Sequence, residues 1–395
     1  MGINPDLKFI KYLKGAGGDT LKKCYQCATC SVVCPLSSDV KPFPRKEMIW
    51  AQWGMKDHLV ADPDIFLCHQ CGDCTAYCPR GAKPGDVLGA IRAYSYTHYG
   101  FPSGLAKLTT EAKNLPLLIG IPAAIILVLW FISGGLHMPQ GEVDFGVFFG
   151  HWDFKYLSKN VFFIDIIMLS AAGLAVFSSY KGVSTMWKKM SEKLECNQAF
   201  KPSAKQFTVD FLWPSVKEIV SHKRFNECGA NQNRVKGHQP LLLAFIGLFL
   251  LTGYSFISKD VFGIFFPSLH GPIPQWNPFK ILGNISAVAM LFGIFVLWGN
   301  RSLEESETGN KGTFYDWFLI YEIAAVGITG LLAELLRLAG IGSLAYLIYY
   351  LHLVAVMMLF LYMPYTKFAH LVYRTFAMAF ERFRESSFVT VKEEK

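Results

Sequence analysis

Long apolar stretches separated by polar segments run through the chain from about residue 101 onward. Each stretch is close to the ~20 residues that an α-helix needs to cross a bilayer. Continuous apolar stretches of this length indicate transmembrane helices rather than amphipathic ones. The pattern predicts six membrane-spanning helices, at 116–136, 161–180, 240–257, 281–299, 317–336 and 344–364.

The first hundred residues have a different pattern, in which apolar positions alternate with charges. The stretch RKEMIWAQWGM, residues 45–55, places Met48, Trp50, Trp53 and Met55 among charges, which predicts an amphipathic helix. A second helix is expected from Asp86, after a turn rich in glycine and proline. We therefore predict an all-α chain with a helical domain at 1–100 and a six-helix membrane domain at 101–395.

Composition and charge agree with this division. Hydrophobic residues make up 52% of the chain and charged residues 17%, which is typical of a membrane protein. The segment 181–239 carries eleven Lys and Arg against five acids, whereas the loops 137–160 and 258–280 carry two basic residues each. By the positive-inside rule the basic loop 181–239 faces the cytoplasm. The basic residues behind the net charge of +8 thus indicate membrane topology rather than nucleic-acid binding. We predict an inner-membrane protein with both termini and the N-terminal domain in the cytoplasm.

Eight of the ten cysteines lie in two copies of the motif C-x2-C-x2-C-x3-C-P, which begin at Cys24 and Cys68. Three thiolates at this spacing surround one corner of a 4Fe–4S cluster, and the fourth ligates the other cluster of a pair. The predicted ligands of cluster one are Cys24, Cys27, Cys30 and Cys78. The predicted ligands of cluster two are Cys68, Cys71, Cys74 and Cys34.

Other uses of clustered cysteines fit this motif less well. Disulfides belong mainly to secreted proteins, and residues 1–23 do not resemble an export signal. A tetrahedral zinc site has no position for a third cysteine at the same two-residue step. Cys196 and Cys228 belong to no spaced motif, so we interpret them as ordinary thiols.

His352 and His370 are 18 residues apart at the last predicted span. On one continuous helix this is five turns, so the two rings would share a face at a separation of about 27 Å. That separation is close to the ~30 Å thickness of the hydrocarbon layer. Two haems stacked across a membrane need one axial histidine in each leaflet, so the spacing predicts two b-type haems. The alternative is one buried and one surface histidine without a cofactor.

Each haem also needs a ligand from another helix. His238 begins the third span at the depth of His370, so His238 and His370 are the predicted pair for the cytoplasmic haem. The candidate partners of His352 are His137, at the outer end of the first span, and His270, in the outer loop FFPSLHGPIP. Of these two, we prefer His270.

One acidic residue lies inside a predicted span at a position that suits proton transfer. Glu322 is about a turn and a half from the cytoplasmic end of the fifth span. Ionisable residues within spans are costly and are functional candidates by default. We interpret Glu322 as the candidate for proton transfer to a quinone.

These features resemble known respiratory proteins. The first hundred residues are similar to helical ferredoxin domains, such as those of succinate dehydrogenase and of the C subunit of heterodisulfide reductase. The membrane part resembles the gamma subunit of respiratory nitrate reductase, whose last haem helix carries two histidines 18 apart, matched here by His352 and His370. The earlier haem helix of that family has two histidines ten apart. His238 matches the first, and Leu248 stands at the second.

The whole chain is similar to the C and E subunits of heterodisulfide reductase in one polypeptide, as in the C subunit of the quinone-interacting membrane-bound oxidoreductase complex. The resemblance implies electron transfer between menaquinol and cytoplasmic flavin and iron–sulfur subunits through haem b and two 4Fe–4S clusters. It implies adenylylsulfate reductase as the eventual partner. One alternative is the membrane subunit of a heterodisulfide reductase or sulfite-reduction complex. Another, of a different class, is a zinc-binding structural membrane anchor.

Overall fold

The structure is a computed structural model that describes residues 4–134, 136, 138–139, 141–149, 161–194, 196, 200–224, 232–308 and 312–393. Within these ranges every regular element is a helix, and no strand occurs. The predicted all-α fold class is therefore confirmed.

Short helices make up the N-terminal part and surround the two cysteine motifs. The predicted amphipathic helix is α3, which buries Met48 completely. The predicted closing helix is α7, which begins at Pro84, two residues earlier than expected. Proline suits a first helical turn because its φ is already helical and its missing N–H has no intrahelical partner there. These helices are α1 (Leu7–Gly15), α2 (Thr29–Val32), α3 (Arg45–Gln52), α4 (Lys56–Val60), α5 (Pro63–Leu67), α6 (Asp73–Ala76), α7 (Pro84–Tyr99) and α8 (Ser103–Leu108).

Six helices of the described chain are long and apolar enough to cross a membrane, which confirms the predicted number of spans. Several extend past the predicted apolar stretch, because a helix can continue into water on polar residues. The six helices are α9 (Leu115–Gly134), α10 (Ile166–Lys193), α13 (Gln232–Ser255), α14 (Pro278–Thr308), α15 (Phe314–Leu338) and α16 (Gly342–Tyr362).

Close helix packing holds the membrane bundle together. Helix α13 packs along α14, α14 along α15, and α15 along α16, while α9 and α10 both contact α16. At the α13–α14 crossing, a Cβ on Gly293 would lie 2.6 Å from the carbonyl oxygen of Gly237. Small residues allow such backbone contact, which provides van der Waals packing where lipid removes the hydrophobic driving force.

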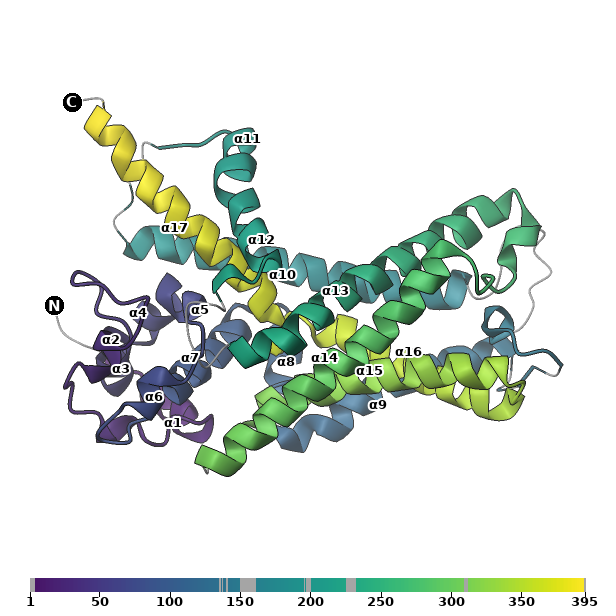
Figure 1. Cartoon of the computed structure of the whole chain (residues 1–395), viewed down its shortest axis with the longest axis horizontal. Coiled ribbons are helices and arrows are strands. Elements are labelled where there is room, and N and C mark those ends of the chain that lie inside the picture. Colours follow the sequence, from purple (N-terminus) through teal and green to yellow (C-terminus); the bar gives the residue numbers. More distant parts are fainter. Residues whose placement is uncertain are drawn as a thin grey trace.

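The cysteine-bearing helices gather at one end of the bundle, and both chain ends lie at this same end (Figure 1). One buried apolar cluster joins the N-terminal helices to α10 and to α17 (His370–Glu393), with Met186, Met190 and Tyr373 packed beside Phe9 and Leu88. The division predicted at residue 100 stays a prediction, since this core runs across it.

The predicted continuous helix through His352 and His370 is wrong. Helix α16 ends at Tyr362, and α17 begins at His370, after the short turn η11 (Lys367–Ala369). Pro364 follows the end of α16 by two residues. Proline lacks the N–H that a continuing helix would use, and its ring disfavours helical geometry before it. The two histidines are therefore not related by five turns of one helix.

The basic segment predicted as one loop at 181–239 contains helices. Helix α10 continues through it to Lys193, and α11 (Ala204–Gln206), η5 (Phe207–Leu212) and α12 (Trp213–Val220) follow. Arg382 of α17 fastens α12 in place by donating to Ser215 Oγ at 2.6 Å and to Glu218 Oε2 at 2.5 Å. Part of the basic segment is thus packed against the C-terminal helix.

Candidate functional site

Four cysteines drawn from both motifs line one small cavity in the N-terminal part. Cys68 follows α5, Cys71 lies two residues before α6, Cys74 lies in its first turn, and Cys34 comes from the first motif. The structure therefore brings together the four residues predicted for cluster two. A cavity lined by four convergent thiols and by apolar side chains such as Phe43 and Leu88 suits a thiolate-bound 4Fe–4S cluster.

The other four cysteines of the motifs gather around Cys30. Its thiol interacts electrostatically with those of Cys24, Cys27 and Cys78. Burial, followed by these neighbouring thiols, raises the pKa of Cys30 to about 11. Because thiolates are the metal ligands, filling such a site with a cationic metal centre releases protons. This is the set predicted for cluster one.

The two motifs share the same loop conformation. Gln26 and Gln70, just before the second cysteine of each motif, both have left-handed backbones, with φ of 59° and 52°. Ala28 and Gly72, just after that cysteine, are left-handed as well. A short helix containing the third cysteine follows in each case. Left-handed non-glycine residues cost free energy, so their repetition indicates a loop shape that the function of both motifs requires.

Backbone and side-chain N–H groups point at the sulfur atoms. The Gln70 amide lies 3.4 Å from Cys68 Sγ, and the Ala82 amide lies 3.3 Å from Cys78 Sγ. Gln26 Nε2 lies 3.4 Å from Cys24 Sγ. Hydrogen bonds to cluster thiolates stabilise their charge and tune the reduction potential.

His238 and His370 lie ring to ring where α13 meets the start of α17. Their ring centroids are 6.1 Å apart, and their planes are inclined by 76°. An imidazole nitrogen binds a metal such as zinc at about 2 Å, so a metal between two rings separates their nitrogens by about 4 Å. Adding the distance from each nitrogen to its ring centre gives a spacing close to the one observed. The centroid spacing is therefore compatible with two imidazoles that would hold one metal centre between them.

Hydrogen bonding sets the proton position on His370. Its Nδ1 lies 2.6 Å from the carbonyl oxygen of Lys367. A carbonyl oxygen can only accept, so Nδ1 carries the proton and donates it. Burial lowers the pKa of His370 to about 4, so the ring is neutral at physiological pH and Nε2 carries the lone pair. Donation from the second ring nitrogen to a backbone carbonyl is the usual arrangement of a metal-binding histidine.

A third histidine, which was not predicted from the sequence, contacts His238. His222 Nε2 lies 2.8 Å from His238 Nδ1, and its Nδ1 lies 3.1 Å from the carbonyl oxygen of Val220. The ring is buried, with 4% of its surface exposed. No motif marks His222, which lies outside every apolar stretch. It follows α12, which packs on α17, and from there its ring reaches His238.

The histidines predicted for the outer haem are not brought together by the described contacts. His352 Nδ1 lies 3.1 Å from Thr329 Oγ1, and its ring lies against Gly330, where a Cβ would be only 2.9 Å away. His137 lies outside the described residues, and His270 is described only as part of the short helix η10 (Pro267–His270). Leu248 packs in an apolar cluster with residues of α14 and α15.

The segments that carry the two kinds of site are in direct contact. Helix α5, which leads into Cys68, packs on α17, which begins at His370. Phe66 stacks on Tyr373 with ring centroids 5.8 Å apart and planes inclined by 17°. The guanidinium of Arg374 interacts electrostatically with both Cys68 and His370.

Glu322 is buried within α15, with 5% of its surface exposed. Its Oε1 accepts no hydrogen bond from the described residues. The hydroxyl of Tyr362 also has no hydrogen-bond partner among the described residues. The two side chains are close enough to interact electrostatically. Glu334, at the other end of the helix, is instead paired with Lys280 and Arg337. An unsatisfied buried carboxyl is rare and calls for a functional explanation.

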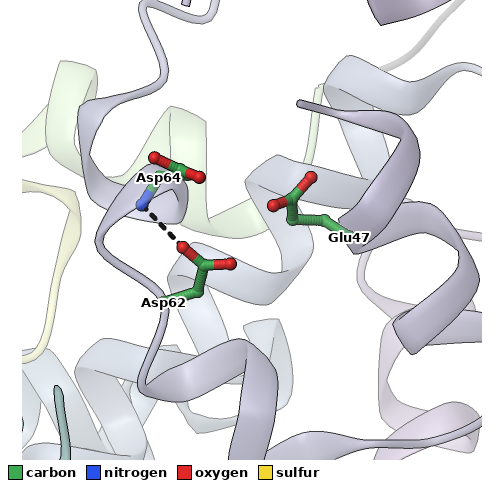
Figure 2. A group of neighbouring side chains, drawn as sticks. All are labelled: Glu47, Asp62 and Asp64. Carbon is green, nitrogen blue, oxygen red and sulfur yellow. Dashed lines mark hydrogen bonds between the residues drawn. The ribbon is translucent and has the colours of Figure 1, made fainter. Parts of the chain in front are cut away.

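Three buried carboxylates in the N-terminal part form a group that could also hold a cation. Glu47 projects from α3 toward Asp62 and Asp64 at the start of α5 (Figure 2). The ammonium of Lys46 already lies 3.0, 2.8 and 3.0 Å from oxygens of Glu47, Asp62 and Asp64. Lysine therefore supplies the positive charge, and we interpret the group as a structural ion cluster.

Replacing Lys46 by methionine is expected to destabilise this region by about 3–5 kcal/mol at pH 8, because it leaves buried charges without a partner. The loss should be smaller near pH 5. Burial raises the pKa of Asp64 from its ordinary 3.8 to about 6, so the native state binds a proton that the unfolded state releases between these values. Raising the pH through this window therefore lowers stability. Hydrogen exchange of α3 and α5, corrected for intrinsic rates, measures the change.

Lys56→Met is the matched control for this change. Lys56 pairs with Asp6 at 2.9 Å, but its side chain is 25% exposed and that of Asp6 is 31% exposed. Such a pair contributes less than about 1 kcal/mol. Equal losses of protection in the two variants would contradict the role assigned to Lys46.

Comparison with known proteins supports an iron–sulfur assignment for the N-terminal part. Residues 20–82 match the family described as 4Fe-4S dicluster domain. The chain is 39% identical over 90 residues to the C subunit of the H(2):CoB-CoM heterodisulfide,ferredoxin reductase of Methanothermobacter marburgensis, covering 22% of this chain and 48% of that protein. It is 34% identical over 97 residues to an Archaeoglobus profundus protein similar to the C subunit of heterodisulfide reductase, covering 24% and 52%. The chain thus spans about half the length of these relatives.

A more distant relative extends into the membrane part. Citrate utilization protein B of Escherichia coli is 25% identical over 296 residues, which is 72% of this chain and 70% of that protein. No solved structure matches the chain. The cysteine-bearing part is therefore homologous to proteins like the C subunit of heterodisulfide reductase. The six long apolar helices that follow it indicate a multi-pass membrane protein.

Proposed function

We propose that this chain exchanges electrons between menaquinol in the membrane and flavin and iron–sulfur subunits in the cytoplasm. The observation that carries the proposal is the contact between α5 and α17, where Phe66 stacks on Tyr373. This contact joins the segment bearing Cys68 to the segment bearing His370, so a membrane redox site and a soluble one would be neighbours. Homology to subunits of an oxidoreductase supports this role.

Each set of residues has a defined part in the proposal. The eight motif cysteines would hold two 4Fe–4S clusters, with Cys34 and Cys78 crossing between the motifs. His238 and His370 would hold a haem b at the end of the bundle nearest the cysteines. When bound, these groups supply one-electron redox chemistry. The pairing of His352 with His270 or His137 at a second haem stays a prediction.

The end of the bundle that carries the cysteine motifs is proposed to face the cytoplasm. Helices α11 and α12 of the basic segment, the N-terminal helices and the C-terminal part of α17 lie at this end (Figure 1). Next in sequence to cysteines of the two motifs, or two residues from one, Tyr25, Val32 and Tyr77 leave more than 60% of their surface exposed, at 69%, 84% and 64%. Exposed apolar side chains beside a redox site suit docking of a partner subunit. The resemblance to the quinone-interacting membrane-bound oxidoreductase complex favours partners that serve adenylylsulfate reductase.

Anaerobic reduction of the purified protein in liposomes by menaquinol tests the function. We expect a haem α-band to appear and the iron–sulfur absorption to bleach, and the electrons to pass on to added partner subunits. Partners from a heterodisulfide or sulfite-reduction complex that accept electrons while adenylylsulfate reductase partners do not would favour that alternative. A protein that contains zinc, and neither iron nor haem, would be a structural anchor.

Glu322→Gln is expected to slow menaquinol-driven reduction by about 10²–10⁴-fold, the usual contribution of a proton-transferring side chain. The glutamine keeps the shape of the side chain but cannot take a proton. Reduction by dithionite, which bypasses the quinol, should be unchanged. Glu334→Gln is the control, since that carboxylate is neutralised by Lys280 and Arg337. Wild-type rates in Glu322→Gln would remove this residue from the quinol reaction.

A further inference from the structure

His222 occupies an unfavourable backbone position at the end of α12. It has a left-handed φ of 52°, two residues after the last helical residue, Val220. Glycine is the usual residue at such a position, because a side chain there is strained. A non-glycine residue in this conformation costs free energy and persists only where surrounding contacts require it. The contacts are those of the ring.

The ring of His222 forms a directed hydrogen-bond chain. The carbonyl oxygen of Val220 can only accept, so His222 Nδ1, at 3.1 Å, is the donor. In the neutral ring the proton is then absent from Nε2, which must accept from His238 Nδ1 at 2.8 Å. That places the proton of His238 on Nδ1 and the lone pair on Nε2. The same proton arrangement holds for His370 through Lys367.

We infer that His222 is a positioning residue for the haem ligand His238, holding its tautomer and increasing its basicity. This inference rests on the proposed haem function of His238. A hydrogen-bond acceptor at the second nitrogen of a ligating imidazole strengthens donation to the metal and stabilises the oxidised iron. His222 therefore keeps the potential of this haem lower than it would be without an acceptor.

The fold explains how His222 reaches His238. Helix α12 is fixed to α17 by Arg382, which binds Ser215 and Glu218. Helix α17 also carries His370 at its first residue. The acceptor for one ligand is therefore held by the helix that supplies the other ligand. The partner of His370 itself is local, since Lys367 lies three residues before it in the chain.

Three substitutions at position 222 test the inference in the full-length protein. His222→Gly removes the acceptor and suits the left-handed backbone, so the protein should fold. We expect its haem to shift to higher potential and haem affinity to fall by about 10–100-fold. His222→Glu supplies a stronger, anionic acceptor, and the potential should shift downward. His222→Gln keeps a neutral acceptor and should lie closest to the wild type.

The readouts are redox titration of the α-band, the low-spin EPR signal of the oxidised haem, and haem content. His98→Gln is the control, because its ring bonds Lys189 at 2.7 Å and not a proposed ligand. Opposite potential shifts in the Gly and Glu variants support the inference, since a merely structural role would move both the same way. Unchanged potentials, or loss of the haem in all three variants, would overturn it. A wild-type protein without haem would instead refute the proposed function itself.

Discussion

Cys78→Ala is expected to remove the cluster held by the opposite motif. Iron content should fall from about eight to about four atoms per chain, with cluster one lost and cluster two kept. The reason is that Cys78 lies with Cys30 in the structure, although it is the last cysteine of the second motif. The measurement is iron and sulfide quantitation with EPR of the reduced protein.

Cys34→Ala is the complementary variant. Cys34 lines the cavity of Cys68, Cys71 and Cys74, so this change should remove cluster two and leave cluster one. Each variant should keep the cluster signal that the other variant lacks. Cys196→Ala is the control, because Cys196 belongs to neither set, and it should keep all the iron. Loss of the same EPR signal in Cys34→Ala and Cys78→Ala would contradict the exchange of ligands between motifs.

His370→Ala is expected to abolish the haem proposed at the end of the bundle. One of its two axial imidazoles would be missing, and the His238 ring 6.1 Å away has no other proposed partner for the metal. His238→Ala should have the same effect. The pyridine haemochrome content measures the loss, and the iron–sulfur content should stay near wild type because the cysteine motifs are unaltered.

His352→Ala distinguishes this haem from the predicted outer one. If two haems bind, His352→Ala should lower the content from about two to about one and leave the signal that depends on His370. Loss of one signal in both His352→Ala and His370→Ala would join these two residues to a single haem. That result would contradict the pairing of His370 with His238.

Some of the site residues could be predicted from the sequence, for physical reasons. The cysteines could be assigned because a cubane cluster needs ligands at fixed short spacings, and such spacings are visible within a short segment of the sequence. The same rule predicts that the last cysteine of each motif, Cys34 or Cys78, ligates the cluster of the other motif. The left-handed residues beside the cysteines, Gln26 and Gln70 among them, could not be predicted, since glutamine does not signal that conformation.

The histidines were harder to predict from the sequence. The pair His238–His370 was predicted by assuming that His370 continues the helix of His352. A break at Pro364 separates His352 from His370. The pair still meets, because the turn after α16 brings the start of α17 to α13. His222 could not be predicted, since its role depends on the docking of α12 through Arg382. Arg382 bonds Ser215, which is 167 residues away in the chain.

The helical class, the six spans and the two cysteine sets could be predicted from the chain alone, because apolar length and ligand spacing are properties of short segments. Three features came only from the folded chain: the contact of His222 with His238, how far the core extends across residue 100, and the packing of α5 on α17. These depend on where helices end and which faces pack, and such choices are made by contacts between residues distant in the chain. Burial also belongs to the folded chain, and it alone left Glu322 without a described hydrogen-bond donor to Oε1.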